Sequence, residues 1–94
     1  MQFEWDAGNA ASNHKKHRVT FDEAVSVFAD SLAVIFDDPA HSNRERREII
    51  IGHSTRNRLL LVCFTERAED IVRIFSARAV TRIERKDYED NAIL

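Results

Sequence analysis

The sequence predicts an α+β fold, an antiparallel sheet flanked by helices. Two capping-box patterns, Thr20-Phe21-Asp22-Glu23 and Thr81-Arg82-Ile83-Glu84, indicate helix starts on either side of the central part of the chain. Apolar runs such as Leu59 to Phe64, separated by short polar turns, fill that centre. Short connections favour hairpins and therefore antiparallel pairing. Helices segregated from a run of strands are typical of the α+β class, here in the order β-α-α-β-β-β-β-α.

Alternation, capping and periodicity define the elements of the first half. Residues 2–5 alternate polar and apolar, which indicates a short strand, and Asp6 can cap a helix over residues 9–17. The helix after Thr20 carries an apolar stripe at i, i+3, i+4 and i+7, formed by Phe21, Ala24, Val25 and Phe28. The short apolar run 33–36 predicts the next strand.

Three strands and a helix are predicted for the second half. Residues 47–52 contain three consecutive isoleucines, residues 59–65 are the most apolar segment, and residues 71–78 form the third strand. Polar turns at 54–57 and 66–70 separate these strands. The last helix is expected to start near Thr81.

Length and composition exclude several classes of protein. Ninety-four residues predict a single domain over 1–94. One cysteine excludes a disulfide framework and a cysteine-rich zinc module, so Cys63 is expected to be a small buried hydrophobe. The longest apolar run is far short of the ~20 residues that cross a bilayer, and the acidic, aromatic start does not resemble a signal peptide. We therefore expect a cytoplasmic protein without a membrane partner.

The net charge of −2 hides an uneven distribution. Residues 1–43 hold three basic and seven acidic side chains, whereas residues 44–94 hold eleven basic and nine acidic ones. Within residues 73–86 five basic side chains face one acidic side chain. Eleven of the 14 basic residues are arginine, which binds phosphate and carboxylate in a bidentate manner. The net charge of −2 excludes a strongly basic protein, but it does not exclude a local phosphate-binding site.

An ordered set of short motifs along nearly the whole chain resembles the BrnT family of toxins. The set comprises Phe3-Glu4-Trp5-Asp6, Asn13-His14-Lys15-Lys16-His17, Val19-Thr20-Phe21, Glu23-Ala24, Asp38, His41-Ser42, Glu45-Arg46-Arg47, Ile51-Gly52, Arg73-Ile74-Phe75-Ser76-Ala77-Arg78, Glu84-Arg85 and Tyr88-Glu89. Three positions depart from the pattern. His14 and Arg18 stand where an apolar residue and a glycine are expected, and Phe75 replaces a usual isoleucine.

The resemblance implies a toxin of a type II toxin–antitoxin pair. Its fold would be similar to that of RelE-type ribonucleases, and its substrate would be RNA, cleaved without a metal or other cofactor so that translation stops. The implied partner is an antitoxin similar to BrnA, which binds DNA through a ribbon-helix-helix-like part and holds the toxin inactive. The toxin itself would reach DNA only through that antitoxin.

Two short segments could supply proton transfer and phosphate binding. Metal-free RNA cleavage needs acid–base groups and preorganised cations around the phosphate. Lys16-His17 offers both, although cations at a helix C-terminus also interact well with the helix dipole. Glu45 beside Arg46 and Arg47 could act as a base between phosphate-binding arginines. Alternatively, Ser42-Asn43-Arg44-Glu45 fits a capping box, and the run could be a solvated charge cluster.

The strand over residues 73–78 is the strongest candidate. Alternation places Arg73, Phe75 and Ala77 on one face and Ile74, Ser76 and Arg78 on the other. Because both faces mix polar and apolar groups, one of the arginines should lie at the edge of the core and need an anion. That anion could be a carboxylate of this chain or a phosphate.

A basic helical stripe could follow, formed by Arg78, Arg82, Arg85 and Lys86. It could track an RNA backbone, dock an acidic antitoxin segment or simply face solvent. Glu84 is expected to cap the helix. Tyr88 could donate a proton or stack on a base, or it could pack on the sheet.

We therefore predict an endoribonuclease whose proton-transfer group is His17 or Glu45. Arg47, Arg73 and Arg78 complete the predicted catalytic set, and the predicted RNA-binding residues are Lys16, Arg46, Arg82, Arg85, Lys86 and Tyr88. His41 and His53 are too isolated to predict a metal site. Two alternatives stay open at this stage: a non-catalytic co-repressor module, and a homodimer formed through an exposed sheet edge.

Overall fold

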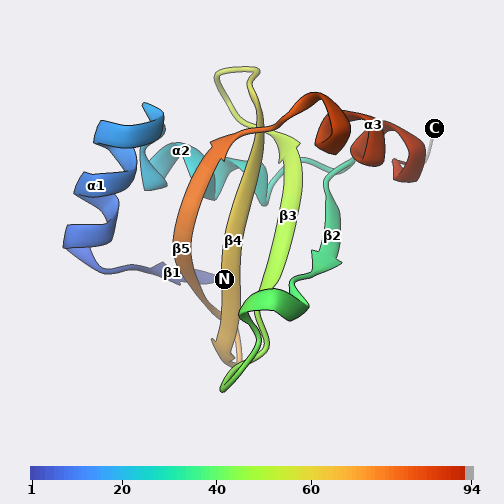
Figure 1. Cartoon of the computed structure of the whole chain (residues 1–94). Coiled ribbons are helices and arrows are strands. Elements are labelled where there is room, and N and C mark those ends of the chain that lie inside the picture. The colour runs from blue at the N-terminus through green and yellow to red at the C-terminus, as the bar shows by residue number, and fades with distance from the viewer. Residues whose placement is uncertain (93–94) are drawn as a thin grey trace.

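A mixed five-stranded sheet in the order β1-β5-β4-β3-β2 forms the centre of the molecule (Figure 1). The computed structural model describes residues 1–92. The elements are β1 (Gln2–Glu4), α1 (Ala7–His17), α2 (Phe21–Val27), β2 (Val34–Asp37), the short 3-10 helix η1 (Pro39–His41), β3 (Glu48–His53), β4 (Leu59–Ala68), β5 (Ile71–Ala79) and α3 (Arg82–Asn91). Strands β2 to β5 pair antiparallel, whereas β1 joins β5 in parallel. The α+β prediction and the order of the elements are confirmed, and β1 makes the sheet mixed.

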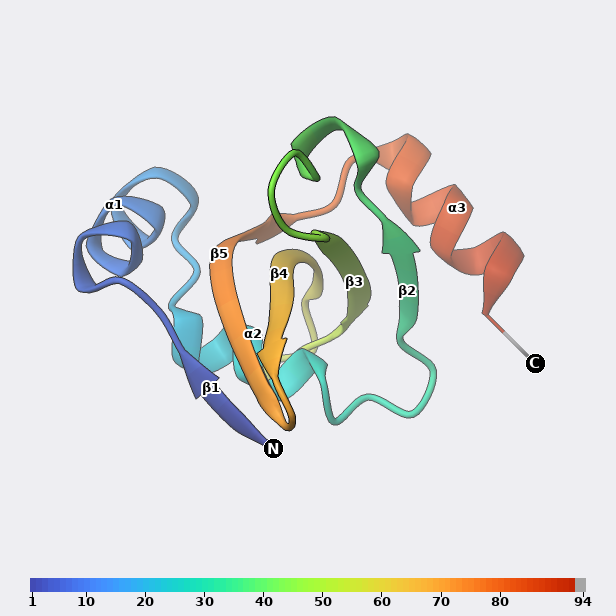
Figure 2. The same cartoon turned by 90° about the horizontal axis from the view of Figure 1, so that it is seen from below.

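The two faces of the sheet are covered to different extents. Figure 2 shows α2 below the sheet and η1 with its loop above it, while α3 lies beyond β2. The larger core cluster, under α1 and α2, includes Phe21, Val27, Leu60, Val62 and Ile74. The smaller cluster, under α3, consists of Ile51, Leu59, Leu61 and Tyr88. Within the described residues, none of the helices has the length and apolar character needed to cross a membrane.

A β-bulge interrupts the pairing of β5 with β4. Cys63 pairs with Ser76 and Phe64 with Ile74, so Phe75 has no partner residue on β4. The extra residue resets the alternation of side chains. As a consequence Ala77 lies in the same core cluster as Ile74. The predicted grouping of Ala77 with Arg73 and Phe75 is therefore wrong, because regular alternation does not pass through the bulge.

Three further details differ from the sequence predictions. The Thr20 side chain accepts a hydrogen bond from the Glu23 amide as predicted, but the Glu23 carboxylate accepts from Ser54 and Arg58 and does not complete the box. Strand β4 extends to Ala68, so the polar turn is shorter than predicted. No helix follows Ser42, which excludes the capping box proposed there. The box at Thr81 is confirmed on both sides.

Helix α1 ends at a residue in the left-handed conformation. Arg18 has φ 59° and ψ 31°, and its amide donates to the His14 carbonyl as a C-cap. Glycine adopts this conformation without steric cost, whereas other residues rarely do. The family resemblance expects glycine at position 18, and the left-handed backbone conformation of Arg18 is one that favours glycine.

Replacing Arg18 with glycine should therefore stabilise the protein. The left-handed conformation costs a non-glycine residue roughly 1 kcal/mol, and the Arg18→Gly variant should recover a gain of that order. Denaturant unfolding would measure it. Lys15→Gly, inside the same helix, is the matched control and should lose about 1 kcal/mol. Equal destabilisation by both substitutions would contradict the assignment of strain to Arg18.

Candidate active site

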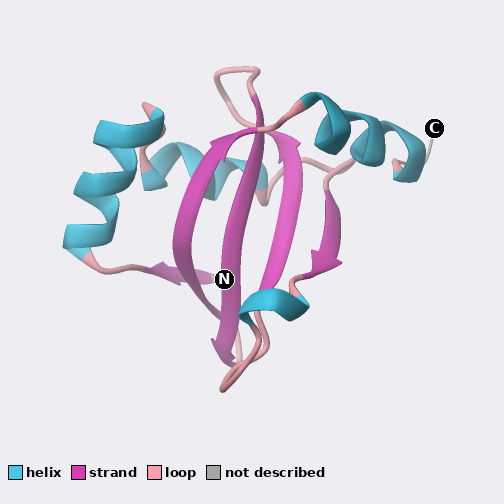
Figure 3. Cartoon of the chain, in the orientation of Figure 1, coloured by secondary structure: helices cyan, strands magenta, loops and turns pink. Residues whose placement is uncertain are grey.

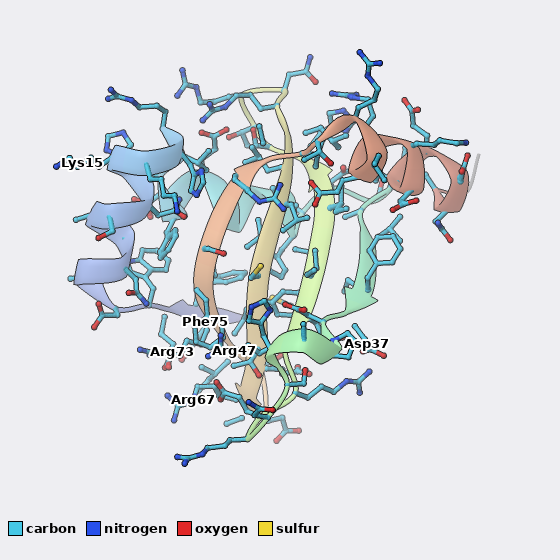
Figure 4. The ribbon with its side chains drawn as sticks, in the orientation of Figure 1. Lys15, Asp37, Arg47, Arg67, Arg73 and Phe75 are labelled. Carbon is cyan, nitrogen blue, oxygen red and sulfur yellow. The ribbon has the colours of Figure 1, made fainter. Side chains whose placement is uncertain are left out.

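The guanidinium of Arg47 stacks on an aromatic ring. Its central carbon lies 3.8 Å from the centre of the Phe75 ring, which the β5 bulge presents on the side of the sheet where Arg47 lies (Figure 4). A cation held over an aromatic face is attracted by the electron density of the ring. The Arg47 Nε atom is buried without a hydrogen-bond partner. Arg47 is therefore a cation held in place by stacking, with donor capacity left over.

The loop before β3 fixes the backbone of Arg47. The Asp38 amide donates to the Arg47 carbonyl at 3.0 Å, and the Arg47 amide donates to Ser42 Oγ at 3.0 Å. Ser42 Oγ in turn donates to the Asp38 carbonyl at 2.7 Å. Figure 3 shows η1 and this loop in front of the strands, on the opposite side from α2. These bonds hold the loop over the less covered face.

One groove brings together three of the predicted site residues. Lys16 and His17 from the end of α1 line it together with Arg47, Phe75 and Ser76, and it encloses about 410 Å³. Lys16 is exposed and His17 half-buried. A phosphate in this groove would meet two cations and one imidazole, which are the groups that RNA cleavage requires.

Asn13 holds the two walls of this groove together. Its buried side chain donates to the carbonyls of Val19 and Ala77, at 3.0 and 2.8 Å, and accepts from the Ala77 amide at 3.0 Å. An amide group that both donates to and accepts from one residue replaces a neighbouring strand. Helix α1 is thereby tied to the edge of β5.

Arg47 also lines a second groove. It encloses about 400 Å³ and is lined by Ala40, His41, Asn43, Arg44, Glu45 and Arg47. Glu45 Oε1 lies 3.6 Å from Arg47 Nη2, so these two residues form an ion pair. Arg46 points elsewhere, because its Nη2 donates to Asp37 at 2.8 Å.

The other predicted strand arginines are paired with carboxylates of this chain. Arg73 donates to Glu4 at 3.0 Å, and this bond contributes most to lowering the pKa of Glu4. Arg78 donates to both oxygens of Glu84, at 2.7 and 2.8 Å. That bidentate pair and the Thr81 amide bring the pKa of Glu84 to about 2, despite its partial burial. The alternation predicts that one of these arginines needs an anion. In the structure both have one, and it is a carboxylate of this chain in each case.

The predicted basic stripe is divided between two elements. Arg78 belongs to β5, whereas Arg82, Arg85 and Lys86 lie exposed on α3. The four residues therefore do not form one helical stripe. Tyr88 is buried and packs with the smaller core cluster, which is the structural alternative considered for it.

Sequence reasoning did not identify Phe75, Ser76 and Asn13 as part of the groove. The alternation of β5 gives no sign of the bulge that turns Phe75 toward Arg47. For Asn13 the sequence offers one weak signal: it is a polar residue in α1, between the alanines and the basic end of the helix. Cys63 lies beside this region, half-buried, and burial raises the pKa of its thiol, which keeps it protonated. Within residues 1–92 no cluster of His, Cys, Asp or Glu is suited to hold a metal ion.

Comparison with known proteins identifies the family. The family described as "Ribonuclease toxin, BrnT, of type II toxin-antitoxin system" matches residues 5–84. The chain belongs to the BrnT family. As a BrnT chain it is a ribonuclease toxin of a type II toxin–antitoxin system, which implies an antitoxin partner.

A crystal structure supports the BrnT fold independently. The Brucella abortus ribonuclease toxin BrnT matches with a TM-score of 0.69 and 20% identity, over 87% of this chain and 99% of that one. No curated relative matches the chain in sequence. At this identity the likeness shows a shared fold, so the roles of individual residues must be argued from the site itself.

The Arg78–Glu84 pair should make stability depend on acid pH. The pKa of Glu84 falls from 4.5 to about 2 on folding, so its contribution is complete above pH 4.5 and is lost as the pH falls toward 2. Glu84→Gln should be less stable than the wild type at pH 7, and the difference should shrink toward pH 2. Denaturant unfolding at several pH values would measure this.

Asp90→Asn is the matched control for that experiment. Asp90 pairs with Lys86 on the same helix, but both side chains are exposed. Exposed pairs contribute little, so this variant should follow the wild type at every pH. A constant difference between Glu84→Gln and the wild type from pH 7 to pH 2 would contradict the assigned pair.

Proposed function

We propose that this toxin is a metal-independent endoribonuclease that cleaves RNA, stops translation and is held inactive by an antitoxin similar to BrnA. The observation that carries the proposal is the Arg47 guanidinium, which stacks on Phe75 in a residue that lines two grooves. Electrostatic stabilisation of a phosphate is strongest when the cation is already in place. We propose that the toxin acts in the cytoplasm and that its substrate there is RNA.

The groove residues divide naturally between charge and proton transfer. Arg47 and Lys16 would bind the phosphate that is attacked, and His17 would transfer a proton. Ser76, on the groove floor, can donate a hydrogen bond to a phosphate oxygen. Glu45 would limit the mobility of Arg47 through its ion pair and remains a second candidate for proton transfer.

The remaining predicted residues would extend the site. Arg73 and Arg78, each about one third exposed or less, would add positive charge that Glu4 and Glu84 balance in part. Arg82, Arg85 and Lys86 would form an exposed surface for the RNA backbone or for an acidic antitoxin segment. Contact with DNA would come only through the antitoxin. For Tyr88 we propose packing under α3 in place of contact with RNA.

Replacing Arg47 should nearly abolish RNA cleavage. Removal of a preorganised donor costs roughly 100- to 1,000-fold in rate, and Arg47→Ala should lose activity of that order. The assay is cleavage of an oligoribonucleotide in EDTA by purified toxin. Arg56→Ala, on the exposed turn between β3 and β4, is the matched control and should retain activity.

Two outcomes of that assay would contradict the proposal. Intact RNA after incubation with excess wild-type protein would exclude metal-independent cleavage. Equal activity of Arg47→Ala and Arg56→Ala would exclude Arg47 from the site. In cells, expression of the chain alone should arrest growth and co-expression of the antitoxin should relieve the arrest, whereas a non-catalytic co-repressor would be tolerated alone.

A further inference from the structure

His41 is held by a buried carboxylate. Its Nδ1 lies 2.9 Å from Asp38 Oδ2, and the Asp38 side chain is 12% exposed while that of His41 is 65% exposed. A carboxylate accepts hydrogen bonds, so Nδ1 carries the proton and donates it to Asp38. The other ring nitrogen, Nε2, is then the free one. A carboxylate in this position fixes the tautomer and the orientation of an imidazole and stabilises the imidazolium that forms when it takes up a proton.

Arg47 shares a groove with each of two histidines. His41 and Arg47 line one groove, whereas His17 and Arg47 line the other. The 3-10 helix supplies the first histidine and the end of α1 supplies the second. A phosphate bound to the Arg47 guanidinium would therefore have one imidazole in each of the two grooves that Arg47 lines.

We propose that His41 is the general base of RNA cleavage, that His17 is the general acid, and that Asp38 positions His41. This inference rests on the proposed ribonuclease function and adds a catalytic residue to it. His17 is assigned as the acid because it lies in the last turn of α1, where a cationic side chain interacts favourably with the helix dipole.

The reaction balances with these two residues and no further reactant. His41 Nε2 takes the proton of the ribose 2′-OH, and O2′ attacks the phosphorus held by Arg47. The bond between phosphorus and O5′ breaks, and His17 gives its proton to O5′. The products are a 2′,3′-cyclic phosphate and a 5′-hydroxyl, with one proton moved from O2′ to O5′ through the two imidazoles.

The surroundings of the two residues favour His41 over Glu45 as the general base. The charged groups that face it are Asp38, which it contacts, and Arg44, Glu45 and Arg47, which line the same groove. Glu45 is paired with Arg47, so its carboxylate faces the cation that would bind the phosphate. His41 is instead held by the Asp38 carboxylate through Nδ1, which leaves its Nε2 free of Asp38.

Alanine variants of both histidines test the assignment. His41→Ala should lower kcat/KM for an oligoribonucleotide in EDTA by roughly 100- to 10,000-fold, and His17→Ala by a similar factor. His14→Ala, exposed on α1 outside both grooves, is the control and should match the wild type. Thermal unfolding of each variant checks that it folds. Added imidazole should restore part of the activity of His41→Ala and leave His14→Ala unchanged.

A substrate with sulfur in place of the bridging 5′-oxygen separates base from acid. Thiolate leaves without protonation, so His17→Ala should approach the wild-type rate on this substrate while His41→Ala stays slow. The reverse pattern would overturn the assignment of roles, and equal rates for His41→Ala and His14→Ala on both substrates would overturn His41 as a catalytic residue. Asp38→Asn should shift the pH profile of kcat/KM on the normal substrate, and an unchanged profile would overturn its positioning role.

Failure of the inference about His41 can be distinguished from failure of the proposed ribonuclease function. If the wild type leaves RNA intact in EDTA, the proposed function fails and the histidine variants have no activity to lose. If the wild type and Arg56→Ala cleave while His41→Ala also cleaves at the wild-type rate, the ribonuclease proposal stands and only the inference about His41 is overturned.

Discussion

The candidate site depends on one buried side chain, that of Asn13. Strand β1 covers the outer edge of β5 only as far as Arg73, and beyond that point the backbone of β5 needs other partners. Asn13 supplies them by donating to the Ala77 carbonyl and accepting from its amide. A buried backbone group left without a partner costs about 1–3 kcal/mol, so this contact both stabilises the edge and fixes α1 against it. The walls of the groove, Lys16 and His17 on one side and Phe75 and Ser76 on the other, are held in register as a result.

The uneven charge of the sequence becomes a pattern of pairing between the two halves of the chain. Carboxylates of the acidic first half pair with arginines of the basic second half: Glu4 with Arg67 and Arg73, Glu23 with Arg56 and Arg58, and Asp37 with Arg46. Five of the ten arginines after residue 43 are therefore paired with carboxylates of the first half. Arg47 differs from these five, because its ion-pair partner, Glu45, belongs to the same half of the chain and its guanidinium stacks on an aromatic ring. The proposed phosphate site is therefore distinguished by one arginine that is not paired with the acidic half, and not by the net charge of the chain.

Patterns that repeat along the chain could be predicted, and contacts across it could not. The capping box at Thr81, the stripe after Thr20 and the apolar runs identify nearly every element, because each signal is local. The convergence of Lys16, His17 and Arg47 was predicted only as separate segments, since the groove joins α1 to the loop before β3. The bulge at Phe75 was missed for a related reason: a bulge is a property of two paired strands, and one strand's sequence shows only alternation.

The substitution at position 75 acquires a physical meaning from this geometry. The family resemblance expects isoleucine there, and phenylalanine stands in its place. An isoleucine could pack against the alkyl part of Arg47, but it has no π-electrons to attract the guanidinium. The Phe75 face holds the charged group itself, at 3.8 Å, and a cation–π contact at a partly exposed site contributes about 1 kcal/mol. Because Nε is buried there without a hydrogen bond, stacking is the interaction that fixes the cation. This chain therefore holds Arg47, the residue proposed to bind phosphate, against an aromatic ring in addition to its ion pair with Glu45.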